Sequence, residues 1–332
     1  MNTTKYYDIS ERGALLRPVS IIIGGRGIGK TYSCLKYAIE SGKPFLYLRN
    51  TDTQMAESAS VFGNPFKRIS LDMERDIRLE KEGKHYVINE YTEGQNSIGY
   101  GAALSTFSNL RGVDLSDVEL VVFDEFIERR KLNFRQFDAF MGMYETINRN
   151  REAQGRLPLM VICLSNSQTL QNPILQGLQI TEVIIDMIRK NEQQRVLDNL
   201  FIELPTAGIT EEKKSAAIYK LAAGSGAARE ALENEFVYDS FRQVVKKPVN
   251  EYLPVCTVYT DLGAIVYYKH KSRPEYYGSS VPAWSAKRYE KEDYMQFMKD
   301  YGLRLQSAEI RQRIYYENYT MKTISENLLK LT

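Results

Sequence analysis

A glycine-rich octapeptide at residues 24–31 limits this 332-residue chain to few folds. It reads Gly24, Gly25, Arg26, Gly27, Ile28, Gly29, Lys30 and Thr31, which fits the pattern of glycine, four residues, glycine, lysine and a hydroxyl residue. An apolar run at residues 19–23 precedes the octapeptide, and residues 31–40 follow it with helical spacing. A strand, a loop of this kind and a helix form the phosphate-binding unit of P-loop proteins. The octapeptide therefore predicts an α/β fold with a phosphate site.

Other segments extend this unit into a sheet. Residues 44–48, 120–123 and 159–164 are short apolar runs, each expected to be a buried strand. Residues 85–89 and 98–104 are expected to add a β-hairpin to that sheet. Strands that alternate with helical segments favour a mostly parallel sheet flanked by helices.

Composition then divides the chain into parts. We expect a P-loop ATPase domain at residues 1–205, a helical linker at 206–235 and a small α+β domain at 236–332. The linker is rich in Lys, Glu and Ala and contains Gly224-Ser225-Gly226, a flexible point. In the last domain, a hairpin at residues 255–260 and 264–269 and two amphipathic helices at 287–300 and 307–330 are expected.

The charge of the chain is unevenly distributed. Residues 241–332 contain 15 Lys or Arg against 10 Asp or Glu, and 12 of the 23 tyrosines. Such a module suits a nucleic-acid surface, although a Tyr-rich core with solvated charges explains the same composition. No run approaches the roughly 18 apolar residues of a membrane span. Three scattered cysteines and two histidines argue against a histidine-rich zinc centre or a histidine-based triad.

An acidic pair follows the apolar run at residues 120–123. Asp124 would lie at the carboxyl edge of the sheet beside the glycine-rich loop, where it can hold Mg²⁺ together with the Thr31 hydroxyl. Lys30 would reach the β and γ phosphates of a nucleotide such as ATP. Glu125 can orient or deprotonate a water molecule, so the pair favours hydrolysis over phosphoryl transfer to a small acceptor.

A third strand end carries small polar residues. Ser165 or Asn166, after the run at 159–164, would lie beside the γ phosphate and sense its loss; an ordinary strand-to-loop transition is the alternative. Arg49 ends the strand at 44–48 and could hold Glu125 in an inactive orientation, or be a surface arginine.

Clustered arginines suggest charge stabilisation from a neighbouring subunit. Within residues 148–151, Arg149 and Arg151 do not share a helical face, so one of them is expected to act in this way, unless the cluster is only solvated. Residues 111–112 and the basic run 129–131 could contact DNA phosphates or face solvent.

These segments together resemble one family. Residues 24–31, 122–127, 149–152 and 162–166 are similar to the DNA-packaging ATPases of small short-tailed bacteriophages with protein-primed genomes. The resemblance implies a P-loop ATPase of the additional-strand, catalytic-glutamate type. By that likeness residues 24–31 and Asn166 bind ATP, Thr31 and Asp124 bind Mg²⁺, Glu125 activates water, Arg149 acts in trans and Arg49 regulates the glutamate.

The resemblance also implies partners. The family works as a homo-oligomeric ring, expected to be a pentamer, at the portal (connector) vertex of the viral prohead in the host cytoplasm. It moves double-stranded DNA, with a packaging RNA as a further partner, and needs no membrane. Its C-terminal domain resembles a ribonuclease-H-like fold without the metal-binding carboxylates, which fits the isolated position of Asp261.

Two other functions stay open. A terminase-like ATPase would also cut DNA in a metal-dependent way. A non-motor nucleotide switch or kinase would share the loop, but the chain has no Asn-Lys-x-Asp guanine-reading motif, and Asp124-Glu125 suits a kinase poorly.

Overall fold

The computed structural model describes residues 5–110, 114–128, 135–166, 169–222, 239 and 241–329. Contacts divide the chain into two compact units. Unit 1 comprises Met1–Ile174 and Asp186–Tyr238, and unit 2 comprises Leu175–Ile185 and Asp239–Thr332. The short segment Leu175–Ile185 is thus assigned to the same unit as the C-terminal residues, which the composition of the chain does not predict. The domain boundaries at residues 205 and 235 stay predictions.

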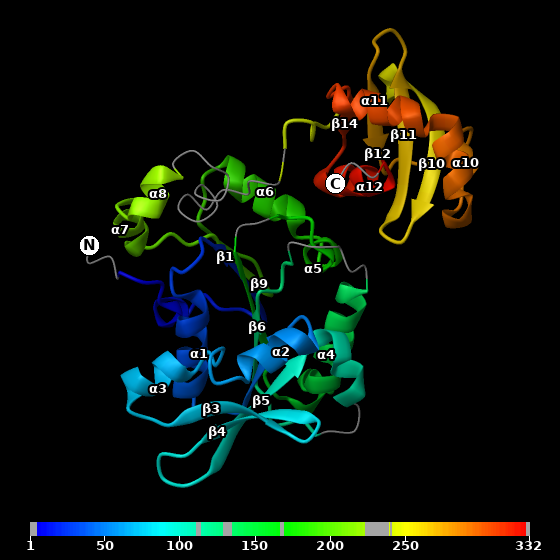
Figure 1. Ribbon diagram of the computed structural model, residues 1–332. Coiled ribbons are helices and arrows are strands. Elements are labelled where there is room, and N and C mark those ends of the chain that lie inside the picture. Colours follow the sequence, from blue (N-terminus) through cyan, green and yellow to red (C-terminus); the bar gives the residue numbers. More distant parts are fainter. Residues whose placement is uncertain are drawn as a thin grey trace. The chain divides into compact units, whose positions relative to one another are not determined.

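Unit 1 is built on a sheet of nine strands in the order β3-β4-β5-β2-β6-β7-β1-β9-β8. Figure 1 labels β1, β3, β4, β5, β6 and β9 of this sheet. The strands in chain order are β1 (Val19–Gly24), β2 (Phe45–Arg49), β3 (Ile77–Glu82), β4 (His85–Glu90), β5 (Asn96–Ala103), β6 (Leu120–Asp124), β7 (Met160–Asn166), β8 (Gln194–Val196) and β9 (Leu200–Glu203). The six strands from β5 to β9 in this order run parallel, and the outer strands β4, β3 and β8 pair antiparallel. The sheet is therefore mostly parallel, as the sequence predicts.

The order of the central strands positions the site. The strand β7 lies between β1, which precedes the glycine-rich loop, and β6, which ends in the acidic pair. Gly24 is in register with Asn166, and Asp124 with Leu164. Because parallel strands align their carboxyl ends, the ends of β1, β7, β6 and β2 meet at one edge of the sheet.

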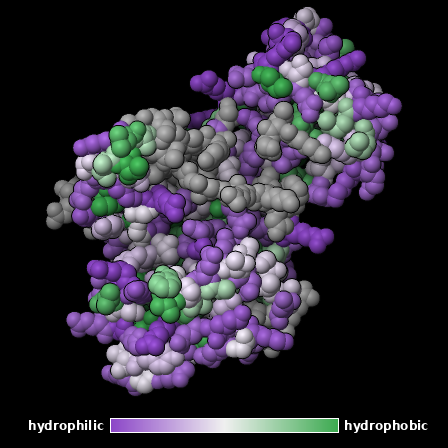
Figure 2. Space-filling model, viewed as in Figure 1, coloured by the Kyte–Doolittle hydropathy of each residue, from purple (hydrophilic) through white to green (hydrophobic). Residues whose placement is uncertain are grey.

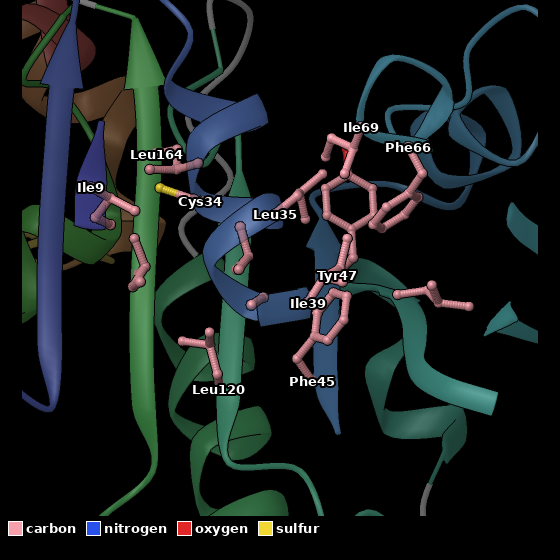
Figure 3. Close-up of a cluster of buried hydrophobic side chains, with 14 of the residues drawn as sticks. Ile9, Cys34, Leu35, Ile39, Phe45, Tyr47, Phe66, Ile69, Leu120 and Leu164 are labelled. Atoms are coloured by element: carbon pink, nitrogen blue, oxygen red, sulfur yellow. The ribbon is translucent and has the colours of Figure 1, made fainter. Parts of the chain in front are cut away.

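Helices cover both faces of this sheet. On one face, α1 (Lys30–Glu40), α2 (Asp52–Ser58) and α3 (Lys67–Met73) pack on a large apolar cluster (Figure 3). In it the ring of Phe66 lies 6.3 Å from that of Phe45. On the other face, Phe140 of α4 (Gln136–Asn148) stacks on Phe123 of β6 with the ring centroids 6.3 Å apart. Alternate strand residues therefore face two separate helical layers.

The strands predicted in unit 1 are largely correct. The four buried strands correspond to β1, β2, β6 and β7, the hairpin corresponds to β4 and β5, and the first helix corresponds to α1. Between residues 52 and 84 the chain forms the strand β3 as well as the helices α2 and α3. In that strand only Ile77 and Leu79 are buried, and they alternate with more exposed residues. Two apolar residues among several charged ones are too few to predict a strand from the sequence.

Several short elements complete unit 1 and the segment shared with unit 2. They are η1 (Ile9–Arg12), η2 (Leu104–Leu110), η3 (Glu152–Gln154), α5 (Pro173–Gly177), α6 (Thr181–Arg189), α7 (Ile209–Lys214) and α8 (Ala217–Leu221). The helices α7 and α8 lie within residues 206–235, for which a helical linker stays a prediction, and Gly224-Ser225-Gly226 lies outside the described residues. Ile218 and Leu221 of α8 are exposed, and Figure 2 shows hydrophobic surface in that region. No helix in the described ranges is long and apolar enough to cross a membrane.

Unit 2 contains a separate sheet in the order β13-β10-β11-β12-β14. Its elements are η4 (Val249–Glu251), β10 (Tyr252–Thr260), β11 (Gly263–His270), β12 (Tyr276–Ser279), β13 (Lys287–Tyr289), η5 (Lys291–Asp293), α10 (Tyr294–Phe297), the π-helical turn η6 (Met298–Gly302), α11 (Leu303–Ile310), β14 (Ile314–Tyr316) and α12 (Tyr319–Leu329). The helices pack on one face of this sheet around Tyr267, Tyr289 and Tyr316. The small α+β domain and its β10–β11 hairpin are therefore confirmed.

Both long C-terminal helices were predicted too long. Lys287–Tyr289 is strand β13, paired parallel with β10, so helix begins only after it. Ile314–Tyr316 is strand β14, paired parallel with β12, and it separates α11 from α12. Each strand has only three residues, which is too few for an apolar period to compete with the helical pattern around it. The likeness of this unit to ribonuclease H stays a prediction.

Candidate functional site

The glycine-rich loop links the carboxyl end of β1 to the N-terminus of α1, as its sequence predicts. Gly27 and Gly29 have φ values of 68° and 101°, in the left-handed region that favours glycine. A side chain at Gly24 would meet Pro205, whose Cγ lies 2.9 Å from the position a Cβ would take. The glycines are thus needed for turning at two positions and for close packing at a third.

Lys30 lies buried at the start of α1 and points back into the loop. Its Nζ donates to the carbonyl oxygens of Gly24 at 2.9 Å and Gly25 at 2.8 Å, and to Oδ1 of Asn166 at 3.2 Å. Burial lowers the pKa of Lys30 to about 8, although the carboxylate of Asp124 opposes this shift. A buried ammonium group held by neutral oxygens is stabilised further by an anion such as a phosphate.

The acidic pair ends β6 directly beside the loop. Asp124 is buried, and its Oδ1 accepts a hydrogen bond from Thr31 Oγ1 at 2.9 Å. Its Oδ2 accepts from the Tyr47 hydroxyl at 3.2 Å. Burial raises the pKa of Asp124 above its usual range. The loop threonine and the β6 aspartate, 93 residues apart in sequence, are therefore in direct contact.

Arg49 bridges both carboxylates of the pair. Its Nη1 donates to Asp124 Oδ2 at 2.9 Å, and its Nη2 donates to Glu125 Oε2 at 2.7 Å. The Arg49 side chain is 14% exposed and that of Glu125 is 49% exposed, so one carboxylate faces solvent while the guanidinium is largely covered. In this conformation Glu125 is held by Arg49, and the regulatory role of Arg49 stays a prediction.

A buried amide network holds the backbone after the acidic pair. Glu125 has a φ of 52°, which a residue with a side chain rarely adopts, and its carbonyl oxygen accepts from Asn50 Nδ2 at 2.7 Å. Gln136 Nε2 donates to Asn50 Oδ1 at 2.7 Å and to the Phe126 carbonyl oxygen at 2.8 Å. Asn172 Nδ2 donates to Gln136 Oε1 at 3.1 Å. The network links β2, the β6 loop, α4 and the segment before α5.

Sequence reasoning missed this network and two further contacts of the site. Tyr47 on β2 bonds to Asp124, and Lys213 on α7 donates to the carbonyl oxygen of Arg26. Burial, aided by the charge of Arg26, lowers the pKa of Lys213. None of these residues belongs to a sequence motif, since each reaches the site from a distant part of the chain. Tyr47 lies in the middle of β2 and Gln136 is the first residue of α4, so neither stands out in the sequence.

The two arginines of residues 148–151 have different surroundings. Arg149 ends α4 and donates through Nη1 to Asp114 Oδ1 at 3.0 Å, with 47% of its side chain exposed. Arg151 is buried and donates through Nη2 to the Ser116 carbonyl oxygen at 3.0 Å. Both lie toward the amino end of β6, because α4 runs back from the acidic edge. Arg149 is therefore not joined to Lys30 or Glu125 within the same subunit.

Several predicted candidates lie elsewhere. Residues 111–112 and 129–131, considered for DNA contacts, lie outside the described residues. Asp261 occupies the β10–β11 turn and pairs with Lys291, with Oδ1 2.7 Å from Nζ. Over the described ranges, no group of three or more His, Cys, Asp or Glu side chains could hold a metal ion.

A pocket of about 210 Å³ is lined by residues from both halves of the predicted phosphate site. Its lining comprises Arg26, Gly27, Gly29, Lys30, Thr31, Tyr32, Asp124, Glu125, Ser165 and Asn166. The ammonium group of Lys30, the hydroxyl of Thr31 and the carboxylates of residues 124 and 125 together fit a polyphosphate with a hard metal ion.

Comparison with known proteins decides the family. The model of the podovirus DNA encapsidation protein (Gp16) family matches residues 1–327. The chain belongs to this family. Among curated members of similar sequence, the DNA packaging protein of Bacillus phage PZA is 25% identical over 74% of this chain and 70% of its own length. That of Bacillus phage B103 is 25% identical over 95% of this chain and 97% of its own length.

Solved structures of packaging motors share the fold of this encapsidation protein. The viral genome packaging motor assembly of bacteriophage phi29 has a TM-score of 0.66 at 19% identity, covering 98% of this chain and 99% of its own. The phi28 gp11 DNA packaging motor has a TM-score of 0.64 at 17% identity, covering 99% of each chain. The resemblance seen in four short segments of the sequence thus extends over nearly the whole length.

Proposed function

We propose that this chain is an ATP-hydrolysing motor that moves double-stranded viral DNA into a preformed capsid. The observation that carries the proposal is the direct contact between the two halves of the site, Thr31 with Asp124 at 2.9 Å. A glycine-rich loop that merely turned would not need a buried carboxylate beside its hydroxyl residue. Membership of the DNA encapsidation family supports DNA as the substrate that is moved and a capsid as its destination.

Different residues of the site bind the phosphates, hold the metal ion and activate water. Lys30, the loop amides and Asn166 hold the phosphates of ATP, and Thr31 with Asp124 would hold Mg²⁺. When bound, that ion neutralises charge on the phosphate oxygens. Glu125 accepts a proton from the water that attacks the γ phosphorus, and ADP and phosphate leave. Burial raises the pKa of Asp124, and a cation held beside this carboxylate would lower it again.

Arg49 keeps the site inactive until ligands arrive. Its guanidinium holds Glu125 Oε2 at 2.7 Å, so the glutamate cannot at the same time accept a proton from water through that oxygen. A cation held by Thr31 and Asp124 would supply the positive charge that Arg49 supplies to this carboxylate, so Arg49 would no longer be needed there. Displacement of Arg49 then frees Glu125, which links turnover to occupancy of the site.

The assembly supplies what one subunit lacks. We propose a homo-oligomeric ring, a pentamer, at the portal of the prohead in the host cytoplasm, with a packaging RNA as a further partner. Arg149 projects from the end of α4, where its exposed guanidinium can enter the site of an adjacent subunit. Loss of the γ phosphate would remove the contacts that hold two subunits in one arrangement.

Replacement of the glutamate tests the proposal. Glu125→Gln keeps the shape of the side chain but cannot accept a proton, so we expect ATP to bind normally and turnover to fall by about 10²-fold or more. The measurement is ATP affinity by calorimetry together with phosphate release. Glu119→Gln is the matched control, because Glu119 pairs with Lys43 before β6 and should leave turnover unchanged. Near-normal turnover of Glu125→Gln would show that another group activates water.

A further inference from the structure

The segment that follows β9 contacts the glycine-rich loop at two places. At its start, Pro205 packs against Gly24, with its Cγ 2.9 Å from the position that a Cβ on Gly24 would take. Further along, Lys213 of α7 reaches the next residues of the loop, and its Nζ donates to the carbonyl oxygen of Arg26. The phosphate motif explains the glycines at this contact but not the lysine.

The helix α7, which carries Lys213, is anchored at its first turn. It lies close to the N-terminal segment (Figure 1), and the Ile209 amide donates to the Lys5 carbonyl oxygen at 2.8 Å. The side chain of Ile209 belongs to the large apolar cluster of unit 1. An ion pair between Lys5 Nζ and Glu212 Oε2, 2.9 Å apart, joins the same two segments. The position of Lys213 beside the loop is therefore set by an anchored helix.

The contact of Lys213 is with one peptide group, which joins Arg26 to Gly27. Lys213 Nζ lies 3.0 Å from the position that a Cβ on Gly27 would take. In a trans peptide the C=O and N–H groups point in opposite directions. Because the carbonyl oxygen of Arg26 faces Lys213, the N–H of Gly27 points away from Lys213. Gly27 lines the phosphate pocket, so this N–H can donate to a phosphate oxygen there.

The orientation of this peptide needs an outside contact to hold it. Gly27 has a φ of 68° and no side chain, so the peptide before it can rotate at little steric cost. A hydrogen bond from an ammonium group to the Arg26 carbonyl oxygen favours one orientation. The same bond polarises the peptide and strengthens its N–H as a donor.

The charges around the loop also favour an anion. Burial lowers the pKa of Lys213, and the nearby charge of Arg26 lowers it further. Burial is the main cause of the lowered pKa of Lys30, to which the charge of Lys213 adds. Three cations gathered at one loop repel one another, and a bound polyphosphate would relieve this repulsion.

We propose that Lys213 is a positioning residue of the phosphate site, which holds the Arg26–Gly27 peptide with its N–H directed at the phosphates of the nucleotide. The inference rests on the proposed function, since it needs the phosphates to lie in the glycine-rich loop. It brings into the site a residue 187 positions after Arg26 in the sequence. Lys213 acts through the loop and does not itself contact the nucleotide.

Replacement of Lys213 by methionine tests the inference on the full chain. Lys213→Met keeps the length of the side chain but removes the charge and the donor. Calorimetry with Mg²⁺ should show that the affinities for ATP and for inorganic tripolyphosphate fall by the same factor, about tenfold, because only a phosphate contact is weakened. The kcat at saturating ATP should change little, since the donor holds the phosphates equally before and during the reaction.

Two further variants complete the comparison. Lys213→Arg keeps a cationic donor and should restore both affinities. Lys214→Met removes the neighbouring cation of α7, which pairs with Glu211, and should leave both affinities unchanged.

Three results would overturn the inference while leaving the phosphate site intact. Unchanged affinities in Lys213→Met would show that the loop orients its amide without Lys213. A fall in kcat as large as the fall in affinity, together with a lower Tm of the ligand-free chain, would show that Lys213 only supports the fold. A loss of affinity for ATP alone would place the effect at the nucleoside.

Failure of the proposed function has a different signature. If the wild-type chain binds ATP and tripolyphosphate no better than Lys30→Ala does, the loop is not a phosphate site, and the role of Lys213 fails with it.

Discussion

Arg49 is the side chain on which the ligand-free site depends most. It is the cation that donates to both Asp124 and Glu125, and Asp124 is buried. Arg49→Ala would leave a buried carboxylate without its counter-charge, so we expect the free energy of unfolding to fall by about 3 kcal/mol in denaturant titrations. Adding Asp124→Asn removes that charge, and the double variant should recover part of the loss. Strictly additive losses would show that the two side chains do not stabilise one another.

Lys30 makes nucleotide binding depend on pH. Burial lowers its pKa to about 8, and the negative charge of a bound phosphate would raise this pKa. Below pH 8 Lys30 is already protonated, whereas above it ATP must bind with uptake of one proton. We therefore expect the affinity for ATP, measured in EDTA, to fall by up to about tenfold per pH unit above 8.

A companion variant separates this effect from other titrations. Lys30→Arg carries its charge throughout this range, so its affinity, although lower at pH 7, should vary little between pH 8 and 9. Calorimetry in buffers of different ionisation enthalpy reports the proton uptake directly. An equal pH dependence in both proteins would assign it to another group.

The elements that build the site show what sequence can and cannot predict. The strands β1, β6 and β7 are continuous apolar runs, because both of their faces are covered, and each could be located without the structure. The motif residues at their ends fall together because parallel strands share an edge. In contrast, β3, β13 and β14 are short or polar, and only their pairing with neighbours makes them strands.

The supporting side chains of the site were beyond prediction for a different reason. Asn50, Gln136 and Asn172 act through contacts between residues up to 86 positions apart in sequence. A single polar residue has no period, and its partner is known only once the elements are packed. The residues of the motifs can therefore be recognised in the sequence, whereas the side chains that hold them in place cannot.

The helix α4 is coupled to the acidic pair through Gln136. Gln136→Leu keeps the volume but removes the donor to the Asn50 side-chain oxygen and one of the two donors to the Phe126 carbonyl oxygen, which should cost about 1–3 kcal/mol of stability. Because Asn50 also holds the Glu125 backbone at its positive φ, turnover should fall more than ATP affinity does. Gln296→Leu, at an exposed position of α10, is the control. Equal loss of affinity and turnover would indicate general damage instead.

The whole assembly is needed to complete the site if Arg149 acts in trans. Arg149 lies at the C-terminal end of α4 and donates to Asp114, which precedes β6, rather than to a residue of the phosphate pocket. Arg149→Ala and Lys30→Ala subunits should each be inactive alone. Mixed, they should regain part of the ATP turnover, because an intact loop then meets an intact arginine. Full activity of Arg149→Ala alone would remove this role.

The central claim is that one site, formed by the glycine-rich loop and the Asp124-Glu125 pair, drives DNA into a capsid. ATP turnover of the purified chain with empty proheads, measured with and without long double-stranded DNA, tests it most directly. We predict that DNA stimulates turnover, that the DNA becomes resistant to added nuclease as ATP is consumed, and that Glu125→Gln abolishes both effects. If DNA leaves the rate of ATP turnover unchanged and stays fully digestible by the nuclease, the account is contradicted.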